Sequence, residues 1–496
     1  MNNTHSYDVI IVGAGISGIN AAYRIQDQLP GFSYAILEAR DDLGGTWDLF
    51  KYPGIRSDSD LFTFGFQFNP WKRDNPIAEG SAIKEYVRDT AHKYGIDQNI
   101  RFGHRLTAAD WSTAQNTWSL TVDRGQEHTS TFTARYVIFG TGYYNYKEPL
   151  RADIPNLDDF QGQIVHPQFW PEDLHYQDKK VVIIGSGATA VTLLPNLADK
   201  AARVTMLQRS PTYILSLPNR TNSRWLSYLL PASLYSRVQR LIWIYTSRFF
   251  FLFCQRFPGF SRWLLKLNVR KQLPAHIPFA PHFQPRYNPW DQRLCVCPDG
   301  DLFRCLRTGK ADVKTDTIRA VTARGITLAS GDTLDADIIV TATGLRLQIA
   351  GGAVLSVDGS KIDIGDKYLW NGVMLQDLPN ASFVIGYTNA SWTLGADATA
   401  LFVCRLLKTL ESRKLLAATP RLKAGEAATL QDRRLLNLNS TYVSVAERAL
   451  PKAADRGPWQ PRDHYLKDLK FAQSGDIDTG LEFVQGPGLR LRPKMS

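Results

Sequence analysis

Short apolar runs alternate with helical stretches in the first part of the chain. Runs at residues 8–12, 33–37 and 136–139 have the length and composition of buried strands. The first run ends in glycine and leads into a helical stretch before the second run begins. This order is typical of a β-α-β unit in a parallel sheet, so the pattern predicts an α/β fold.

The same strand-glycine-helix order begins again near residue 181. Apolar runs at residues 181–184 and 204–207 predict two strands of a second unit, and the Pro- and Asp-rich passage at 147–159 predicts a linker before it. After residue 211 the pattern becomes helical, aromatic and basic. Further strands are predicted at 326–328, 337–341 and 383–385, and a further helix near 398–410.

The length of the chain indicates more than one domain. A chain of 496 residues is too long for one ordinary core and suggests two or three packed domains. We predict an α/β fold with two Rossmann-like dinucleotide-binding domains and a helical insertion in the second of them. The predicted segments are 1–145 and 381–496 for the first domain, 146–215 and 311–380 for the second, and 216–310 for the insertion.

The first glycine-rich turn has the sequence GAGISG at residues 13–18. Glycine permits the tight turn and lets the backbone approach a pyrophosphate, whose charge the following helix N-terminus stabilises. Glu38 lies 20 residues after Gly18, at the end of the next strand, where a carboxylate accepts hydrogen bonds from ribose hydroxyls. An acid there disfavours a 2′-phosphate, so this turn is predicted to bind FAD or NAD rather than NADP; the alternative is an incidental glycine-rich turn.

The second glycine-rich turn has the sequence GSGATA at residues 185–190. The strand that follows this unit ends at Arg209 and Ser210, so an arginine stands where the first unit has an acid. A guanidinium group can bind phosphate oxygens in bidentate fashion, which predicts a preference for NADPH over NADH. The alternative interpretation of Arg209 is a solvated surface cation.

The passage between the two units resembles the fingerprint of one flavoenzyme family. Residues 160–171 read FQGQIVHPQFWP and fit the FxGxxxHxxxWP pattern of type I Baeyer–Villiger monooxygenases; sister flavin-containing and N-hydroxylating enzymes usually lack its Trp-Pro end. A second family motif matches at GGTW, YPG and Asp58. Stretches that resemble the ethionamide-activating monooxygenase subgroup lie at 48–50, 52–58, 288–294 and 386–394.

The resemblance implies an FAD-containing enzyme that uses NADPH and O2 to convert ketones to esters or lactones and that also oxidises sulfides. Such an enzyme must exclude water and stabilise anionic oxygen species, for which a permanently charged donor is suited. Arg293 matches the family's active-site arginine, and Asp58 matches the carboxylate that orients it, as a buried pair. The alternative is a structural salt bridge, or for Arg293 a place in the basic surface.

The residues predicted to bind the two cofactors lie mainly in the two turns, in the GGTW motif and in the second crossing loop. They are Gly13, Gly15, Ser17, Gly18, Glu38, Gly45, Thr46, Trp47, Asp58, Gly185, Gly187, Ala188, Thr189, Ala190, Arg209, Ser210, Thr343 and Gly344. No metal ligand is predicted.

Two further positions are interpreted through the family. The fingerprint residues His166 and Trp170 are interpreted as anchors of the connection between domains, and the family histidine couples domain motion to cofactor binding. The chain departs from many relatives at Gln292, where they have a lysine near the NADP phosphate, and at Gly140, where they have alanine. The first departure leaves more of the phosphate binding to Arg209.

The net charge of +11 is concentrated in residues 211–290, which contain eleven Arg or Lys and no Asp or Glu. The same residues include seventeen aromatic side chains. Two interpretations remain open: a peripheral membrane surface that binds anionic lipid headgroups, or a helical insertion packed on the NADPH domain with solvated cations outside. Nucleic acid is not predicted as a partner, because no reading motif accompanies the charge.

The cysteines and the N-terminus bear on the competing functions. The chain has five cysteines, no set of four with zinc spacing and no secretory pattern, which favours a cytoplasmic protein, with or without membrane association. A disulfide reductase needs a redox pair near the flavin, but residues 1–253 contain no cysteine, and only Cys295 and Cys297 could serve. An S- or N-oxygenating monooxygenase and a non-catalytic flavin redox sensor are two more functions that the motifs leave open.

The predicted partners are O2 and a hydrophobic ketone or thioether.

Overall fold

The computed structural model describes residues 5–125, 128–221, 223–436, 443 and 446–486. Its largest sheet defines what we call the first body. The strands of this sheet are β1 His5–Val12, β2 Tyr34–Leu37, β3 Ile100–Arg101, β4 Arg105–Ser112, β5 Thr117–Asp123, β6 Thr129–Phe139, β17 Val354–Val357, β18 Ser360–Lys361 and β21 Ala381–Phe383. Their order is β18-β17-β4-β5-β6-β1-β2-β3, with β21 also paired to β6.

The strands at the centre of the first body are buried on both faces. In β1, Val9 and Ile11 belong to one apolar cluster, and Ile10 and Val12 belong to another on the opposite face. A strand covered on both sides shows a continuous apolar run, which is why the strand prediction at residues 8–12 is confirmed. The helices of this body are α1 Ile16–Gln28, α2 Thr46–Leu49, α3 Leu61–Phe64, α4 Gly80–Lys93, α10 Trp392–Ser412 and α12 Tyr465–Ser474.

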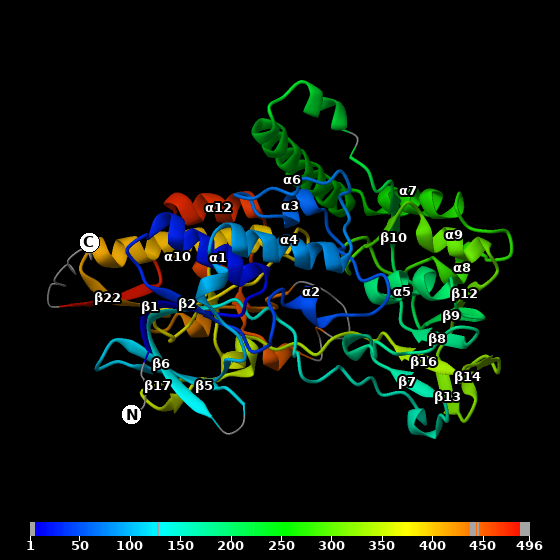
Figure 1. Ribbon diagram of the computed structural model, residues 1–496, viewed down its shortest axis with the longest axis horizontal. Coiled ribbons are helices and arrows are strands. Elements are labelled where there is room, and N and C mark those ends of the chain that lie inside the picture. Colours follow the sequence, from blue (N-terminus) through cyan, green and yellow to red (C-terminus); the bar gives the residue numbers. More distant parts are fainter. Residues whose placement is uncertain (1–4, 126–127, 222, 437–442, 444–445, 487–496) are drawn as a thin grey trace.

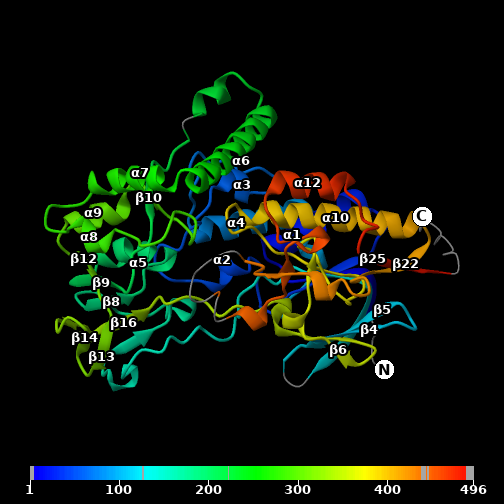
Figure 2. The same cartoon turned by 180° about the vertical axis from the view of Figure 1, so that it is seen from behind.

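The second body is built on a separate, fully parallel sheet. Its strands are β7 Gln163–Val165, β8 Lys180–Ile184, β9 Arg203–Gln208, β12 Ala311–Thr315 and β16 Ile338–Thr341, in the order β12-β9-β8-β16-β7. Helices α5 Ala188–Ala198 and α9 Asp301–Arg307 cover it. Figure 1 and Figure 2 show the two bodies side by side, with the second body at the end opposite the C-terminus. The α/β prediction is confirmed.

Two strands, one of them predicted, lie in places that their sequences do not reveal. The run at residues 326–328 is a strand, β14 Gly325–Leu328, but it pairs with β13 Ile318–Thr322 and β15 Thr333–Asp335 in a small antiparallel sheet. Strand β17 pairs with β4 in the first body, although it falls inside the segment predicted for the second domain. We therefore propose that the chain returns to the first body between Thr341 and Val354 rather than at residue 381.

The predicted helical insertion lies between two paired strands, β10 Ile214–Leu217 and β11 Cys295–Pro298. It contains the short helix η4 Arg224–Tyr228 and the helices α6 Ala232–Arg256, α7 Pro258–Arg270 and α8 Phe279–His282. Figure 1 shows α6 and the turn before it projecting from the edge of the molecule. Among the described residues, no helix is long and apolar enough to cross a membrane.

Helix α6 packs on the first body rather than only on the second. Arg240 is buried, and its Nη1 donates to the carbonyl oxygens of Phe62 (3.0 Å), Thr63 (3.3 Å) and Gly65 (2.8 Å) around α3. These carbonyls lie in and just after α3, where backbone acceptors lack helical partners, so a cation satisfies them. The insertion therefore connects the two bodies.

The remaining strands form short two-stranded pairs around the first body. They are β19 Leu369–Trp370 with β20 Met374–Leu375, β22 Leu415–Pro420 with β25 Leu481–Gln485, and β23 Asp432–Arg433 with β24 Ala453–Ala454.

Candidate active site

A cavity of about 1950 Å³ lies between the two glycine-rich turns and extends to the inner face of α6. A pocket for one drug-sized ligand usually measures roughly 300–1,000 Å³, so this cavity has room for more than one ligand. Its lining includes residues from both glycine-rich turns, Glu38, Arg209 and the pair Arg293 and Asp58. The predicted nucleotide sites and the predicted catalytic residues therefore face a common space.

The first turn has the backbone that a pyrophosphate site needs. Gly13 has a φ of +99°, and a Cβ there would lie 2.9 Å from the carbonyl oxygen of Gly140; a Cβ on Gly18 would collide with the backbone of Gly13. Glycine is therefore required at both positions by close approach of backbone segments. Helix α1 begins just after Gly15, so its unsatisfied N–H groups point into the cavity.

Glu38 is fixed against this turn. Its carboxylate accepts hydrogen bonds from the backbone N–H groups of Ala14 (2.6 Å) and Arg40 (2.9 Å). Burial raises the pKa of Glu38, and the two N–H donors oppose that shift. The carboxylate lies at the end of β2 on the cavity wall, where it can accept hydrogen bonds from a ribose. The turn and Glu38 together fit the adenosine half of FAD.

The GGTW motif forms the opposite wall of the first nucleotide site. Gly45 has a φ of +57° and approaches Gly15, since a Cβ on it would lie 3.1 Å from the Gly15 Cα. Thr46 and Trp47 begin α2, and the Thr46 hydroxyl lies 3.4 Å from the hydroxyl of Tyr146. Burial raises the pKa of Tyr146 to about 12, so this hydroxyl remains a neutral hydrogen-bonding group.

In the second glycine-rich turn, Gly185 lies close to another backbone segment, whereas Gly187 faces open space. Gly185 has a φ of +141°, and a Cβ there would collide with the carbonyl oxygen of Ala342. Gly187 precedes α5, and a Cβ there would meet no atom within 4 Å. A helix N-terminus with free space above it fits the pyrophosphate of a second dinucleotide. Ala188, Thr189 and Ala190 form the first turn of α5.

Other predicted residues surround the second turn. Arg209 and Ser210 follow β9 on the cavity wall, and both are exposed. Thr343 and Gly344 line the cavity after β16, and the buried Thr343 hydroxyl has no hydrogen-bond partner among the described residues. The Arg209 guanidinium at the end of β9 and the Thr343 hydroxyl in the loop after β16 are suited to bind the phosphate groups of NADPH.

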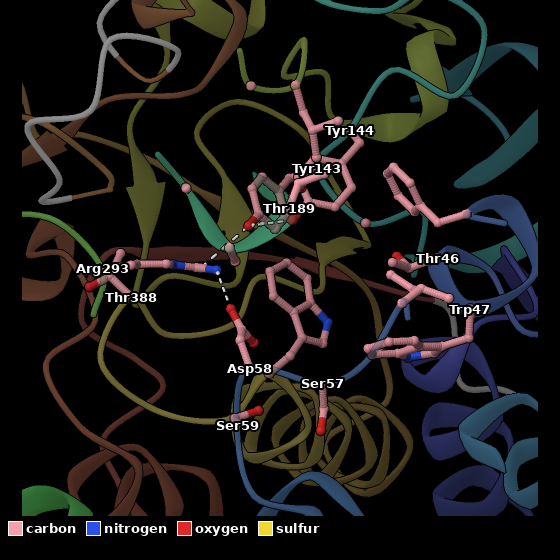
Figure 3. Close-up of a pocket in the computed structure, with 18 of the residues that line it drawn as sticks. Thr46, Trp47, Ser57, Asp58, Ser59, Tyr143, Tyr144, Thr189, Arg293 and Thr388 are labelled. Atoms are coloured by element: carbon pink, nitrogen blue, oxygen red, sulfur yellow. Dashed lines mark hydrogen bonds and ion pairs between the residues drawn. The ribbon is translucent and has the colours of Figure 1, made fainter. Parts of the chain in front are cut away.

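Arg293 and Asp58 face each other across the cavity (Figure 3). The Arg293 Nη1 lies 3.7 Å from the Asp58 Oδ2. The expectation of a buried pair is wrong: 35% of the Arg293 side chain and 49% of the Asp58 side chain are exposed, because both point into the cavity. A partly exposed pair at this distance stabilises a fold by less than about 1 kcal/mol, so its geometry suits ligand binding better than structural support.

The loop that carries Arg293 is a strained turn. Trp290 has a φ of +74°, a left-handed conformation that is uncommon for a bulky side chain. The turn is closed by hydrogen bonds in both directions between Asn288 and Asp291, of 2.9 and 3.1 Å. The Trp290 ring packs edge-on against Phe251 of α6, with ring centroids 5.6 Å apart. Backbone strain of this kind is commonly kept where it positions a functional group, here Arg293.

Tyr143 and Trp392 complete the site, and the sequence analysis missed both. The Tyr143 hydroxyl accepts hydrogen bonds from the Arg293 Nη2 (3.3 Å) and from the Tyr144 hydroxyl (2.8 Å). Its ring stacks on Trp392, with centroids 5.0 Å apart, and the Trp392 Nε1 donates to the Ser17 hydroxyl (2.8 Å). These contacts connect the first glycine turn to Arg293. Two features of the sequence could have indicated these residues. Tyr143 directly follows the loop after a predicted strand, and Trp392 lies in the stretch 386–394 that resembles the family.

The fingerprint residues lie behind the cavity rather than in its lining. His166 is partly buried, and this burial lowers its pKa. Its Nδ1 accepts from the Gln168 N–H (3.2 Å), which caps the short helix η3 Pro167–Phe169. Trp170 is buried in an apolar cluster that also contains Tyr52. These positions support their interpretation as anchors between the bodies.

The cysteines do not resemble a redox pair. All five are free and buried. Burial raises the pKa of Cys295 to about 12 and also raises the pKa of Cys297, so both thiols stay protonated and unreactive. Among the described residues, no group of three or more His, Cys, Asp or Glu side chains could hold a metal ion.

Comparison with known proteins relates the chain to one family. The sequence profile of flavin-binding monooxygenase-like proteins matches residues 6–408. The FAD-containing monooxygenase EthA of Mycobacterium tuberculosis is 47% identical over 495 residues, covering 98% of this chain and 99% of EthA. The probable FAD-binding monooxygenase AlmA of Acinetobacter baylyi is 44% identical over 476 residues, covering 96% and 95%.

Solved structures share the fold at low sequence identity. Cyclohexanone-bound cyclohexanone monooxygenase has a TM-score of 0.75 at 20% identity, over 97% of this chain and all of the other. OTEMO in complex with FAD and NADP has a TM-score of 0.75 at 19% identity, with the same coverage.

Proposed function

This chain belongs to the flavin-binding monooxygenase-like family, and on that premise we propose that it is an FAD-containing, NADPH-dependent Baeyer–Villiger monooxygenase. It converts hydrophobic ketones to esters or lactones and also oxygenates thioethers. The observation that carries the proposal is the position of Arg293, held by Asp58 and Tyr143 in the cavity onto which both nucleotide turns open. The ketone in the cyclohexanone-bound relative of the same fold supports this choice of substrate.

The first body would hold the flavin dinucleotide. The N–H groups at the start of α1 bind its pyrophosphate, and the Glu38 carboxylate accepts the ribose hydroxyls. The Gly45 backbone and the Thr46 side chain cover the cofactor from the opposite wall. When bound, FAD supplies the electron transfer from NADPH and the activation of O2.

The second body would hold NADPH. The N-terminus of α5 above Gly187 binds the pyrophosphate, and Arg209 binds the 2′-phosphate with its guanidinium fork. Gln292 lines the cavity beside Arg293 and has no charge, so it offers a phosphate only neutral hydrogen bonds.

Arg293 would stabilise the negative charge that develops on the substrate oxygen. Its guanidinium carries a permanent positive charge and presents several N–H donors in a planar fork. Asp58 balances part of the charge and, with the Tyr143 hydroxyl, fixes the direction of the fork. A preorganised donor of this kind lowers the barrier because no reorientation is needed when charge appears.

One part of the cavity wall is apolar, and this part would exclude water from the reaction. Large hydrophobic side chains from the first body, the insertion and the Arg293 loop meet there. They are Ile77, Leu215, Trp243, Phe250, Trp290 and Leu294. Such a lining favours hydrophobic ketones and thioethers over polar ones.

The test is product analysis with purified holoenzyme, NADPH and isotopically labelled O2. Cyclic, linear and aromatic ketones should each be offered, together with thioethers. We expect one labelled oxygen atom in an ester or lactone, and NADPH oxidation that the ketone stimulates. Labelled sulfoxides with no ester from any ketone would leave only the S-oxygenating alternative. Ketone-independent NADPH oxidation with no labelled product would refute the proposal.

A further inference from the structure

The molecule exposes an unusual concentration of large hydrophobic side chains on one segment. Of the nineteen large hydrophobic side chains that are exposed in the described part of the chain, thirteen lie between residues 225 and 264. Their exposed fractions range from 37% to 77%. They are Trp225, Tyr228, Leu229, Leu234, Leu241, Ile242, Tyr245, Phe249, Leu252, Phe257, Phe260, Trp263 and Leu264, and we call them the α6–α7 apolar surface.

Helix α6 is apolar on two opposite faces. Its inner face carries Trp243, Ile244 and Phe250, which line the cavity. Its outer face repeats at helical spacing through Leu241, Tyr245 and residues 249 and 252, all of which are exposed. Burial of the inner face and the Arg240 anchor explain why the helix stays on the molecule; neither explains the outer face. Exposed apolar area of this extent marks an interaction site.

The surface carries positive charge without negative charge. Exposed cations lie within and beside it at Arg237, Arg256, Arg262, Arg270 and Lys271. No acidic residue occurs anywhere in residues 211–290. Arg248 reaches outside the segment for its partner, Asp463, at 3.3 Å. Aromatic side chains interspersed with Arg and Lys suit the headgroup region of a bilayer, where the rings enter the boundary and the cations meet anionic phosphates.

We propose that the α6–α7 apolar surface binds the face of an anionic lipid bilayer, with α6 lying along the interface. The charge distribution favours a membrane over a second copy of the chain. A symmetric dimer through this surface would bring its cations together with no acid from the segment to oppose them. Figure 1 and Figure 2 show α6 and η4 at the outer edge of the molecule, where a flat surface can reach them.

This inference deepens the proposed function and, for the choice of substrate, rests on it. The same helix separates the bilayer from the cavity, since its outer face meets lipid and its inner face meets substrate. Thr246 is exposed and also lines the cavity, so the cavity reaches the surface at the border of the apolar surface. A ketone or thioether dissolved in the bilayer would therefore enter beside α6 without crossing water.

Vesicle flotation of the full-length, FAD-loaded protein tests the inference. We expect binding to phosphatidylcholine vesicles that contain phosphatidylglycerol, weaker binding to phosphatidylcholine alone, and release by high salt. The double variant Arg237→Glu and Arg256→Glu should lower binding to anionic vesicles by at least about tenfold. The double variant Leu241→Ser and Phe249→Ser should lower binding to both kinds of vesicle.

Matched controls come from the opposite side of the molecule, on β17 and β18. Val354 is an exposed hydrophobic residue and Lys361 an exposed cation, so Val354→Ser and Lys361→Glu should leave vesicle binding unchanged. No binding at low salt, or binding indifferent to phosphatidylglycerol, would overturn the proposal. So would a dimer that the Leu241→Ser and Phe249→Ser variant dissociates while vesicles bind neither form.

The vesicle assay needs only folded, FAD-loaded protein, so it does not depend on which substrate the enzyme oxidises. A protein that binds vesicles but makes no ester would keep the membrane proposal and refute the Baeyer–Villiger one. A protein that makes ester but does not bind vesicles would keep the Baeyer–Villiger proposal and refute the membrane proposal. Turnover of a water-soluble ketone without vesicles should be unchanged by substitutions on the outer face.

Discussion

The contacts of Arg293 come from parts of the chain that are far apart in sequence. Asp58 lies in the loop before α3, and Tyr143 follows the crossing loop after β6. Trp392 stacks on Tyr143 and also donates to Ser17 in the first glycine turn. Two aromatic side chains, Tyr143 and Trp392, thus link the first nucleotide site to the guanidinium.

Replacement of Arg293 should separate NADPH consumption from product formation. Arg293→Ala leaves both glycine turns intact, so we expect NADPH oxidation to continue while ester formation falls by about a hundredfold or more. Arg293→Lys keeps the charge but loses the planar fork toward Asp58 and Tyr143. Its rate of ester formation should lie between the rates of the unmodified enzyme and Arg293→Ala. Parallel assays of NADPH and ester measure the split, with Arg203→Ala on the protein surface as a control. Normal ester formation by Arg293→Ala would remove it from the mechanism.

Arg209 should decide between the two nicotinamide cofactors. Arg209→Ala removes a bidentate phosphate donor, and we expect the KM for NADPH to rise by roughly tenfold to a hundredfold. The KM for NADH should change little, because NADH has no 2′-phosphate. Steady-state kinetics with each cofactor provide the comparison, and equal changes for both would contradict the assignment.

The sequence predicted those site residues whose type is required by the local backbone conformation. Gly13 and Gly185 have positive φ and close neighbours, so their constraint is local and leaves a motif. Tyr143 and Trp392 have no local requirement for their type; their role arises when distant strands and helices come together. The exposure of the pair Arg293 and Asp58 could not be predicted either, because it depends on the size of the cavity between the bodies.

At the scale of elements, the second turn offers a matched pair of glycines. Gly187→Ala places a methyl group in open space, so the fold should be kept while the affinity for NADPH falls by about tenfold. Gly185→Ala meets the Ala342 carbonyl at a positive φ and should destabilise the protein by about 2 kcal/mol or more. NADPH titration and thermal unfolding of both variants test this. Similar behaviour of the two would show that the open space above Gly187 is not the pyrophosphate site.

Helix α3 carries a pH-dependent cap. Asp60 accepts a hydrogen bond from the Thr63 N–H (2.8 Å), and full burial raises the pKa of Asp60 to about 6 although Arg240 opposes the shift. Because the folded pKa lies above the unfolded value of about 3.9, the contribution of this group to stability is full below about pH 4 and is lost as the pH rises through 6.

Asp60→Asn should therefore gain stability relative to the native chain between pH 4 and pH 7. The gain should reach up to roughly 3 kcal/mol at the upper end, because asparagine caps α3 without a buried charge. Melting temperatures of the two proteins at each pH provide the measurement. A difference that stays constant over this range would show that Asp60 does not titrate there.

Helices and strands could be predicted where a hydrophobic pattern is compatible with only one type of secondary structure. Runs buried on both faces, as in β1 and β8, were recognisable because no polar side alternates with the apolar one. The pairing of β17 with β4 was not recognisable, since pairing of distant strands leaves no trace in either strand. The outer face of α6 was expected to be either buried or lipid-facing, and periodicity alone cannot separate these cases.

At the scale of the whole molecule, contacts from one loop hold the two bodies together. Arg56 of the first body forms an ion pair with Asp301 at the start of α9, and only 12% and 18% of the two side chains are exposed. The Tyr52 hydroxyl is hydrogen-bonded to Thr189 of the second turn. Asn196 of α5 packs directly over Gly54. The motif between Tyr52 and Asp58 thus joins the bodies and also carries Asp58, the carboxylate that we propose orients Arg293.

Loss of Arg56 should loosen this connection. Arg56→Ala leaves the Asp301 carboxylate mostly buried without its partner and should destabilise the protein by about 3 kcal/mol. The double variant with Asp301→Asn removes the stranded charge and should recover part of that loss. Thermal unfolding and the KM for NADPH are the readouts. A double variant no more stable than Arg56→Ala would show that the pair does not join the bodies through its charge.

The first body is assembled from both ends of the chain, and this sets the order in which a nascent protein can fold. Strand β5 covers only the first part of the β6 edge, and β21 covers the last residues, next to the first nucleotide turn. The Asn380 side chain, just before β21, donates to the carbonyl of Arg135, a residue 245 positions earlier. On the ribosome, the second body is therefore complete while the first still presents an open strand edge, and such edges invite wrong pairing. The first glycine-rich turn therefore gains its last neighbouring strand, β21, only after the second body has been synthesised.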